Sequence, residues 1–170
     1  GSQPFGGEGM SGTGPKAGGP EYVARMSRPE WRSENMKGSA GDHAAIQTAI
    51  EAAKPPQDPL ATFDLPGPTG ESNRLSTFGR GVVLCLGPGA EAAEAQAIAA
   101  REAGCAPVIA AIEPEALAML TGFTAAVSWA DETTLRAQRH ALATRDDAII
   151  PLIAEADPRP RLTLERHVCI

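Results

Sequence analysis

The sequence predicts an α/β protein in which a parallel β-sheet is covered by helices on both faces. From residue 80 onward, short apolar runs alternate with segments of helical spacing, which is the pattern of βαβ units. The run GVVLCLG is continuously apolar and bounded by glycines, as expected of a strand buried on both faces. The first 41 residues differ, because they are mostly irregular and eight glycines lie among the first twenty.

The opening stretch QPFGGEGMSGTGPKAGGP, residues 3–20, is predicted to be a loop with one fixed path. Glycine disfavours the interiors of helices and strands, so neither element suits this stretch. A flexible linker would be a plain Gly/Ser run, whereas Phe5, Lys16 and three prolines stand here at irregular intervals. Such a loop needs a scaffold to hold it. A short amphipathic piece near residues 22–26 follows.

A helix and a connector are predicted between this loop and the α/β region. Asp42 is suited to be an N-cap, and apolar residues recur at helical spacing from Ile46 to Ala53. The helix is expected to end before Pro55, because proline cannot continue it. Residues 54–73 are rich in proline and glycine and are expected to be an irregular connector.

Five strands and three helices are expected from residue 80 to residue 170. The expected strands are GVVLCLG (81–87), APVIAAI (106–112), TAAVSW (124–129), AIIPLIA (148–154) and RLTLERHVCI (161–170). The expected helices are residues 91–104 with Gly104 at the end, a short helix opened by Pro114, and a helix capped by Asp131 that runs to about Thr144. The fold class is therefore Rossmann-like, with regions 1–41, 42–79 and 80–170.

Composition excludes several classes of function. The net charge is −6 and the pI is near 5.1, so a nucleic-acid surface, which needs clustered Lys and Arg, is not expected. No apolar run approaches the roughly 20 residues that a membrane span needs. Three cysteines at scattered spacing do not make a disulfide framework. A reducing cytoplasm is the expected location.

The sharpest local motif is the turn in LCLGPGAEAAEAQ, which follows an expected strand and opens an expected helix. Gly87, Gly89 and Ala92 fit the G-x-G-x-x-A pattern of a dinucleotide-binding turn. Glu113 ends the next strand, where an acid that binds a ribose could stand. The motif makes a dinucleotide site one hypothesis for this chain.

Three residues in the same turn argue against a bound phosphate. Pro88 removes one backbone N–H from the cradle that would hold it. Glu91 and Glu94 are expected in the first turn of the helix, where they would repel a pyrophosphate. An ordinary tight turn is the favoured interpretation, and no cofactor is expected on this chain.

The other reactive residue types are not expected to form a site. The cysteines are interpreted as small buried hydrophobes: Cys85, Cys105 and Cys169. The histidines lie far apart and show no metal-ligand spacing: His43 at a helix N-terminus, His140 on a solvated helix face, and His167. The acidic residues near the third helix belong to its first turn and to a loop: Glu132, Asp146 and Asp147. Neither a catalytic residue nor a metal ligand is therefore expected.

Both ends of the chain suggest a piece of a longer protein. It opens on Gly1 and Ser2, and its first methionine is Met10, inside the loop. It closes at Ile170 on an alternating run without a turn or polar tail. We therefore expect a fragment whose last domain is truncated at its C-terminus.

The opening loop closely resembles the C-terminal active-site loop of the aldehyde dehydrogenase superfamily, in particular the branch that oxidises glutamate semialdehyde. Within that branch, LPGPTGESNRLSTFGRGVVLCLG (65–87) resembles the segment that follows the dehydrogenase in long forms of the proline utilization A family. The final ERHVCI (165–170) is similar to a late strand of the same family. The resemblance covers almost the whole chain.

The resemblance implies a bifunctional parent that joins an FAD-dependent proline dehydrogenase to an NAD-dependent L-glutamate γ-semialdehyde dehydrogenase. Phe5 matches the phenylalanine that lines the aldehyde pocket. The catalytic cysteine, the general base and the parts that bind NAD and FAD would lie upstream, so the chain alone is expected to catalyse neither oxidation.

By the same resemblance, residues 1–41 would end the aldehyde dehydrogenase domain. Residues 80–170 match an extra Rossmann-like domain that has no known catalytic role and covers the cavity through which the intermediate passes. Its partners would be the two dehydrogenase domains of the parent and, in a homo-oligomer, further copies. Two other hypotheses for the function remain open, namely an autonomous dinucleotide-binding module and a regulatory or oligomerisation module.

Overall fold

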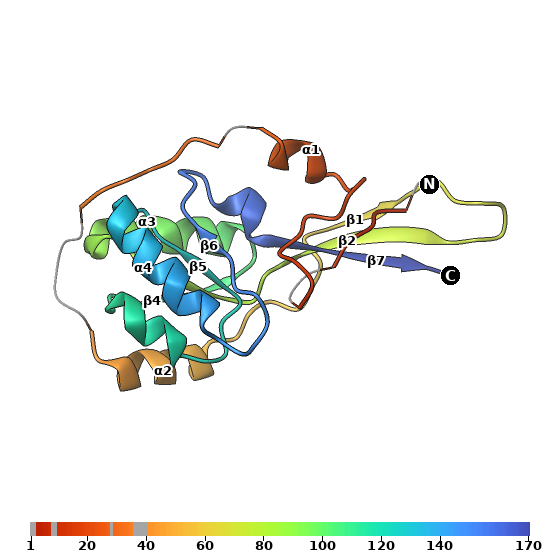
Figure 1. Ribbon diagram of the computed structural model, residues 1–170. Helices are drawn as coiled ribbons and strands as arrows, with labels where there is room; N and C mark the ends of the chain where they lie inside the picture. Colours follow the sequence, from red (N-terminus) through yellow and green to blue (C-terminus); the bar gives the residue numbers. More distant parts are fainter. Residues whose placement is uncertain (1–2, 8–9, 28, 36–40) are drawn as a thin grey trace.

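Figure 1 shows the computed structural model of the chain, which describes residues 3–7, 10–27, 29–35 and 41–170. The helices are α1 (Tyr22–Arg25), α2 (His43–Ala52), α3 (Gly89–Glu102) and α4 (Glu132–Ala143), with the 3₁₀ helices η1 (Pro114–Ala118) and η2 (Arg159–Arg161). The strands are β1 (Ala61–Asp64), β2 (Asn73–Gly79), β3 (Val82–Cys85), β4 (Ala106–Ile109), β5 (Ala125–Val127), β6 (Leu152–Ile153) and β7 (Thr163–Cys169).

A four-stranded parallel sheet forms the centre of the molecule, in the order β4-β3-β5-β6. Every residue of β3 and β5 is buried. Side chains of α2, η1 and α4 pack on one face of the sheet. Alanines of α3 pack on the other face together with Trp129 and Leu162. The prediction of a parallel α/β sheet with helices on both faces is therefore confirmed.

The expected helices are present with small differences at their ends. Asp42 accepts a hydrogen bond from the Ala44 N–H and caps α2, and Asp131 caps α4 through the Thr134 N–H. The strand expected at 148–154 shortens to the two residues of β6. The amphipathic piece near residue 22 is the single turn α1.

The last strand is not in the parallel sheet, so that part of the prediction was wrong. β7 pairs antiparallel with β2, and β2 pairs antiparallel with β1, in a second sheet of order β1-β2-β7. The physical reason is visible in the sequence TLERHVC, which places the three consecutive polar or charged residues Glu165, Arg166 and His167 in the middle of the strand, so that both faces carry them. Such a strand cannot be buried on both faces, as an inner strand of a parallel sheet must be.

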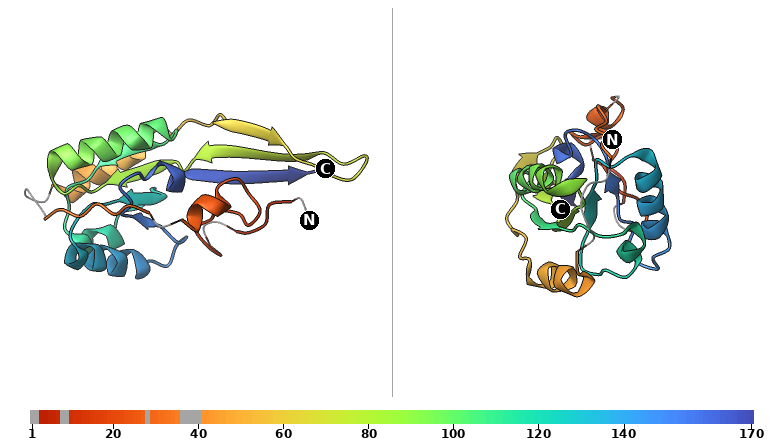
Figure 2. Two further views of the ribbon diagram at one scale, coloured as in Figure 1. Left: turned by 90° about the horizontal axis from the view of Figure 1, so that it is seen from above. Right: turned by 90° about the vertical axis from the view of Figure 1, so that its left-hand side faces the viewer.

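The connector also contains structure that the sequence analysis missed. β1 lies inside residues 54–73, which were expected to be irregular, and β2 begins at the end of that stretch. The antiparallel sheet thereby joins residues on both sides of position 80. Figure 2 shows this sheet extending away from the α/β part, with both chain termini on that side.

Candidate functional site

The turn after β3 is the place where an α/β fold of this order would bind a ligand. From β3 the chain continues to β4 on one side, and β5 lies on the other, so the sheet order reverses between β3 and β5. Gly87 and Gly89 have φ angles of 89° and 75°, which favour glycine, and α3 begins at Gly89. The G-x-G-x-x-A residues therefore stand in the expected strand–turn–helix context.

The side chain of Gln96 fills the inner side of this turn. The Gly87 N–H donates to Gln96 Oε1 at 3.0 Å, and Gln96 Nε2 donates to the Gly87 carbonyl at 2.7 Å. The Trp129 N–H reaches the same carbonyl at 2.8 Å. Gln96 itself is fully buried. One backbone donor that a phosphate cradle would need is thus already used within the protein.

A second segment covers the same edge of the sheet from outside. We call residues 29–35 the strap; Glu34 bridges to Ala130 after β5, and Trp31 bridges to Glu155 after β6. The Glu34 N–H donates to the Trp129 carbonyl at 2.7 Å, and the guanidinium of Arg32 lies 4.3 Å from the centre of the Trp129 ring. The Ala156 N–H donates to the Glu30 carbonyl at 2.8 Å.

One of the two acids expected in the first turn of α3 lies elsewhere. Glu91 is in the first turn of α3, as expected. Glu94 is not, because α3 begins at Gly89, and its carboxylate lies 3.1 Å from Arg101 instead. Glu113 precedes η1 without a side-chain capping bond. With Pro88 at the N-cap and Gly87 bonded to Gln96, these residues do not fit the pyrophosphate cradle of a dinucleotide.

The cysteines divide into two buried thiols and one exposed thiol. Cys85 and Cys105 are buried as expected, and burial raises the pKa of both thiols, that of Cys85 to about 12. Cys169 was expected to be buried as well, and this was wrong. It ends β7, an edge strand of the antiparallel sheet, where one face is open.

The histidines and acids lie apart. His43 is the first residue of α2, His140 is exposed in the last turn of α4, and His167 contacts the amide oxygen of Asn73. Within the described part of the chain, no three His, Cys, Asp or Glu side chains gather as metal ligands would.

The glycine-rich loop packs on the antiparallel sheet. Phe5 and Ala17 exchange two backbone hydrogen bonds of 2.9 and 2.6 Å, which close the loop on itself. The Lys16 N–H donates to the Glu165 carboxylate of β7 at 2.6 Å. The side chain of Phe5 is 79% exposed. The scaffold that the loop required is therefore β7, from the other end of the sequence.

Glu165 is the residue that sequence reasoning missed. It lies 149 positions from Lys16, so no local pattern links the two. The available signal was an acid at an inward-facing position of an alternating strand, opposite the polar Thr77 of β2.

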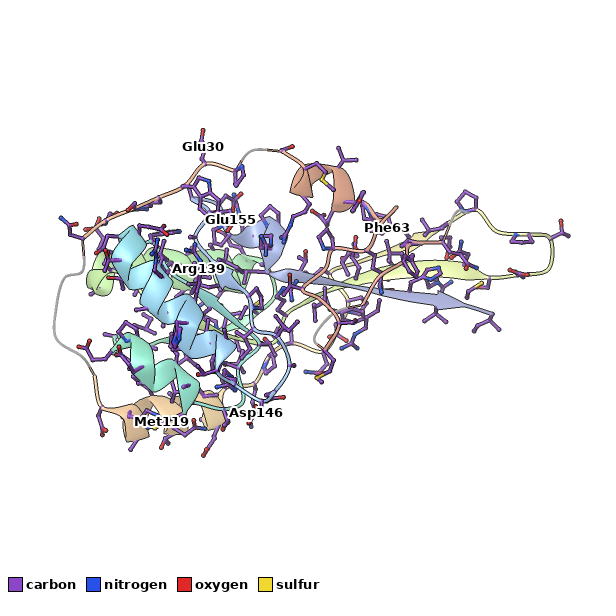
Figure 3. All side chains as sticks on the ribbon, in the orientation of Figure 1. Glu30, Phe63, Met119, Arg139, Asp146 and Glu155 are labelled. Carbon is purple, nitrogen blue, oxygen red and sulfur yellow. The ribbon has the colours of Figure 1, made fainter. Side chains whose placement is uncertain are left out.

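A cavity of about 660 Å³ lies between the strap, α1 and the loop after β6. Figure 3 labels Glu30 and Glu155, which lie on the two facing segments. Four carboxylates and two guanidinium groups line this cavity: Glu21, Glu30, Glu155, Asp157, Arg25 and Arg161. The mixed charges, two of which form a 2.9 Å ion pair between Arg161 and Glu155, do not define one class of ligand.

The fold and this site define a Rossmann-like α/β unit whose antiparallel sheet holds a glycine-rich loop. In its turn after β3, Gly87 is bonded to Gln96, and a cavity of about 420 Å³ separates the start of α3 from the strap. Comparison with known proteins finds relatives that are each called bifunctional protein PutA. The protein of Salmonella typhimurium is 30% identical over 98% of this chain, and that of Escherichia coli K12 is 29% identical over the same share. The protein of Klebsiella aerogenes is 36% identical over 62% of this chain.

These matches confirm the resemblance to the proline utilization A family: the chain is related to a segment of the PutA proteins. It spans only 16% of the Salmonella and Escherichia relatives and 10% of the Klebsiella relative. No family model matches the chain. Among its described residues, no helix is long and apolar enough to cross a membrane.

Proposed function

We propose that this chain is a non-catalytic part of a bifunctional proline-catabolic enzyme, in which residues 80–170 cover the cavity between the two active sites. The observation that carries the proposal lies at the turn after β3, where Gln96 bonds both backbone groups of Gly87. A cavity of about 420 Å³ remains between the strap and the start of α3, but Pro88 offers it no N–H, Glu91 lines it, and Arg32 in its lining is paired with Glu34 at 2.7 Å. A Rossmann-like unit without a phosphate cradle still offers surface for docking. A cover confines a reactive intermediate without taking part in either chemical step.

The two oxidations belong to other parts of the parent in this proposal. The flavin would serve the oxidation of proline and NAD that of glutamate semialdehyde, and this chain would bind neither. Its partners would be the two dehydrogenase domains, with further copies in a cytoplasmic homo-oligomer. These assignments rest on the resemblance and on the relatives called bifunctional.

Phe5 is the one residue of this chain to which we assign contact with substrate. We propose that its ring lines the aldehyde pocket of the parent. Two features support this assignment: the ring is 79% exposed, and the backbone that carries it is fixed by the bridge to Ala17. An exposed ring on a fixed backbone is suited to packing against another domain.

The proposal is tested by the coupled reaction of the parent enzyme. The truncation replaces residues 81–161 with a short Gly/Ser turn and keeps β7 with Glu165, because the Arg80 N–H already donates to the Leu162 carbonyl at 2.9 Å. It should leave the oxidation of proline, and that of added glutamate semialdehyde, near the rates of the full-length protein. NADH formation from proline should then show a lag, because the intermediate escapes and must accumulate in solution. A folded truncation that shows neither lag nor escape would falsify the cover role.

A matched control separates loss of cover from loss of folding. The substitution Phe5→Ala in the full-length parent should raise the KM for the aldehyde, yet introduce no lag in the coupled reaction. The truncation should introduce the lag and leave the KM for the aldehyde unchanged. Circular dichroism and the rate of proline oxidation check that both proteins are folded.

A further inference from the structure

Glu165 is a buried carboxylate beneath the glycine-rich loop. Its side chain is 3% exposed, in the middle of β7. One oxygen, Oε2, accepts the Lys16 N–H at 2.6 Å. The other, Oε1, has no hydrogen-bond partner among the described residues. Burying a carboxylate is costly unless donors compensate it, so an acid at this position requires an explanation.

The loop approaches this carboxylate closely because it has glycine there. A Cβ atom built on Gly19 would lie 2.6 Å from Glu165 Oε1 and 2.9 Å from Oε2. A side chain at position 19 would therefore require either the Glu165 carboxylate or the loop to move. The Gly19 N–H turns back to the Lys16 carbonyl at 3.0 Å, so Lys16 and Gly19 form one turn over the acid.

The anchor at Lys16 is adjacent to the bridge that holds Phe5. Ala17 follows Lys16 in the chain, and its N–H and carbonyl are the groups bonded to Phe5. A second contact, from Arg80 Nη2 to the Thr13 carbonyl at 2.6 Å, holds the far side of the loop. Fixing Lys16 thus fixes the backbone on which the Phe5 ring stands.

We propose that Glu165 is a positioning residue for Phe5: its carboxylate accepts the Lys16 N–H and sets the orientation of the Phe5–Ala17 pair. β7 of the antiparallel sheet would thereby help to shape the aldehyde pocket of the parent. This consequence for the pocket rests on the proposed function, whereas the positioning of the loop does not.

Amide hydrogen exchange in the full 170-residue chain tests the positioning. Glu165→Ala removes the acceptor, and exchange at the Ala17 and Phe5 amides should become faster by about tenfold, the loss of one net hydrogen bond. Glu165→Gln keeps an acceptor oxygen in the same place and should exchange like the wild type. Glu102→Ala is the control, because it removes a half-exposed acid of α3 that is paired with Arg159.

The variant Glu165→Leu keeps the test decisive if the alanine variant does not fold. Leucine has a similar size and buries no charge, yet it accepts no hydrogen bond. Protection of the β3 amides reports that the α/β part is intact. Faster exchange at Ala17 in this variant supports the proposal, and unchanged exchange at Ala17 and Phe5 overturns it.

Kinetics of the full-length parent separate this inference from the proposed function. Glu165→Leu should raise the KM for the aldehyde, leave proline oxidation unchanged, and be rescued by Glu165→Gln. If exchange at Ala17 becomes faster while the KM stays the same, Glu165 still positions the loop and the role assigned to Phe5 is wrong.

Discussion

At the scale of single residues, Gln96 decides what the turn after β3 can do. Its amide satisfies both the N–H and the carbonyl of Gly87, and it is fully buried in α3. Buried backbone groups need such partners. A protein that used this turn for phosphate would instead leave the Gly87 N–H free to face the ligand.

Gln96→Ala should therefore destabilise the fold by about 1–3 kcal/mol, because it leaves the buried Gly87 N–H without its partner. Urea unfolding of the whole chain measures the change. Gln57→Ala is the control, since Gln57 is exposed in the connector and donates to the nearby Pro55 carbonyl at 3.0 Å. Equal midpoints for the two variants would show that the Gln96 contact contributes nothing.

The thiols should differ in reactivity and in their effect on stability. An aromatic disulfide reagent should modify Cys169 in the native protein, and Cys85 and Cys105 only after unfolding. Peptide mass mapping identifies the modified residues. Rapid native modification of Cys85 would contradict the burial described for it.

The raised pKa of Cys85 also predicts how stability depends on pH. Its folded pKa is about 12 against an ordinary value of 9.0, so the unfolded chain loses this proton first. The contribution is complete below pH 9.0 and is lost as the pH rises toward 12. Cys85→Ala should reduce the fall in stability over that interval. An unchanged fall in this variant would exclude Cys85 as its source.

At the scale of elements, the strands of the parallel sheet are easier to predict from the sequence than those of the antiparallel sheet. β3 and β5 are buried on both faces, so their apolar runs stand out. β2 alternates, with Leu75 buried and Arg74 exposed, and its flanks are rich in proline and glycine. The alternation of buried and exposed residues was present in the sequence, but the proline and glycine on either side favoured the prediction of an irregular connector.

The partner of a strand is harder to predict than the strand itself. β7 was expected as a strand, yet its neighbour is β2, and the paired residues Leu75 and His167 lie 92 positions apart in the sequence. The contact between Glu165 and the glycine-rich loop is equally hard to predict, because the segment that buries this acid comes from the other end of the chain. Local periodicity carries no information about such pairings.

Leu75→Ala tests whether the antiparallel sheet has a core of its own. Leu75 is fully buried, and removing its side chain should cost about 2–5 kcal/mol. Val168→Ala, on the exposed side of β7 with 54% of the side chain accessible, should change stability by less than about 0.5 kcal/mol. Chemical unfolding compares the two, and similar effects would mean that Leu75 is not buried as described.

At the scale of the whole molecule, chain segments from three regions meet at the edge where an α/β sheet binds its ligand. The strap comes from residues 29–35, Gln96 from α3, and Trp129 from the segment that follows β5. Gln96 and Trp129 both donate to the Gly87 carbonyl, and the strap donates to the Trp129 carbonyl, so these hydrogen bonds link the three segments. We propose that the Rossmann-like unit covers a neighbouring domain and that its turn after β3 binds no nucleotide.

Titration of the isotopically labelled chain with NAD⁺, followed through the backbone amide resonances of Gly87 and Gly89, tests that claim most directly. We expect both resonances to stay in place up to millimolar NAD⁺, because the Gly87 N–H remains bonded to Gln96. Matched titration of Gln96→Ala shows whether the side chain is what closes the turn. A saturable shift at Gly87 and Gly89 in the wild-type chain would contradict the account and favour a dinucleotide-binding module.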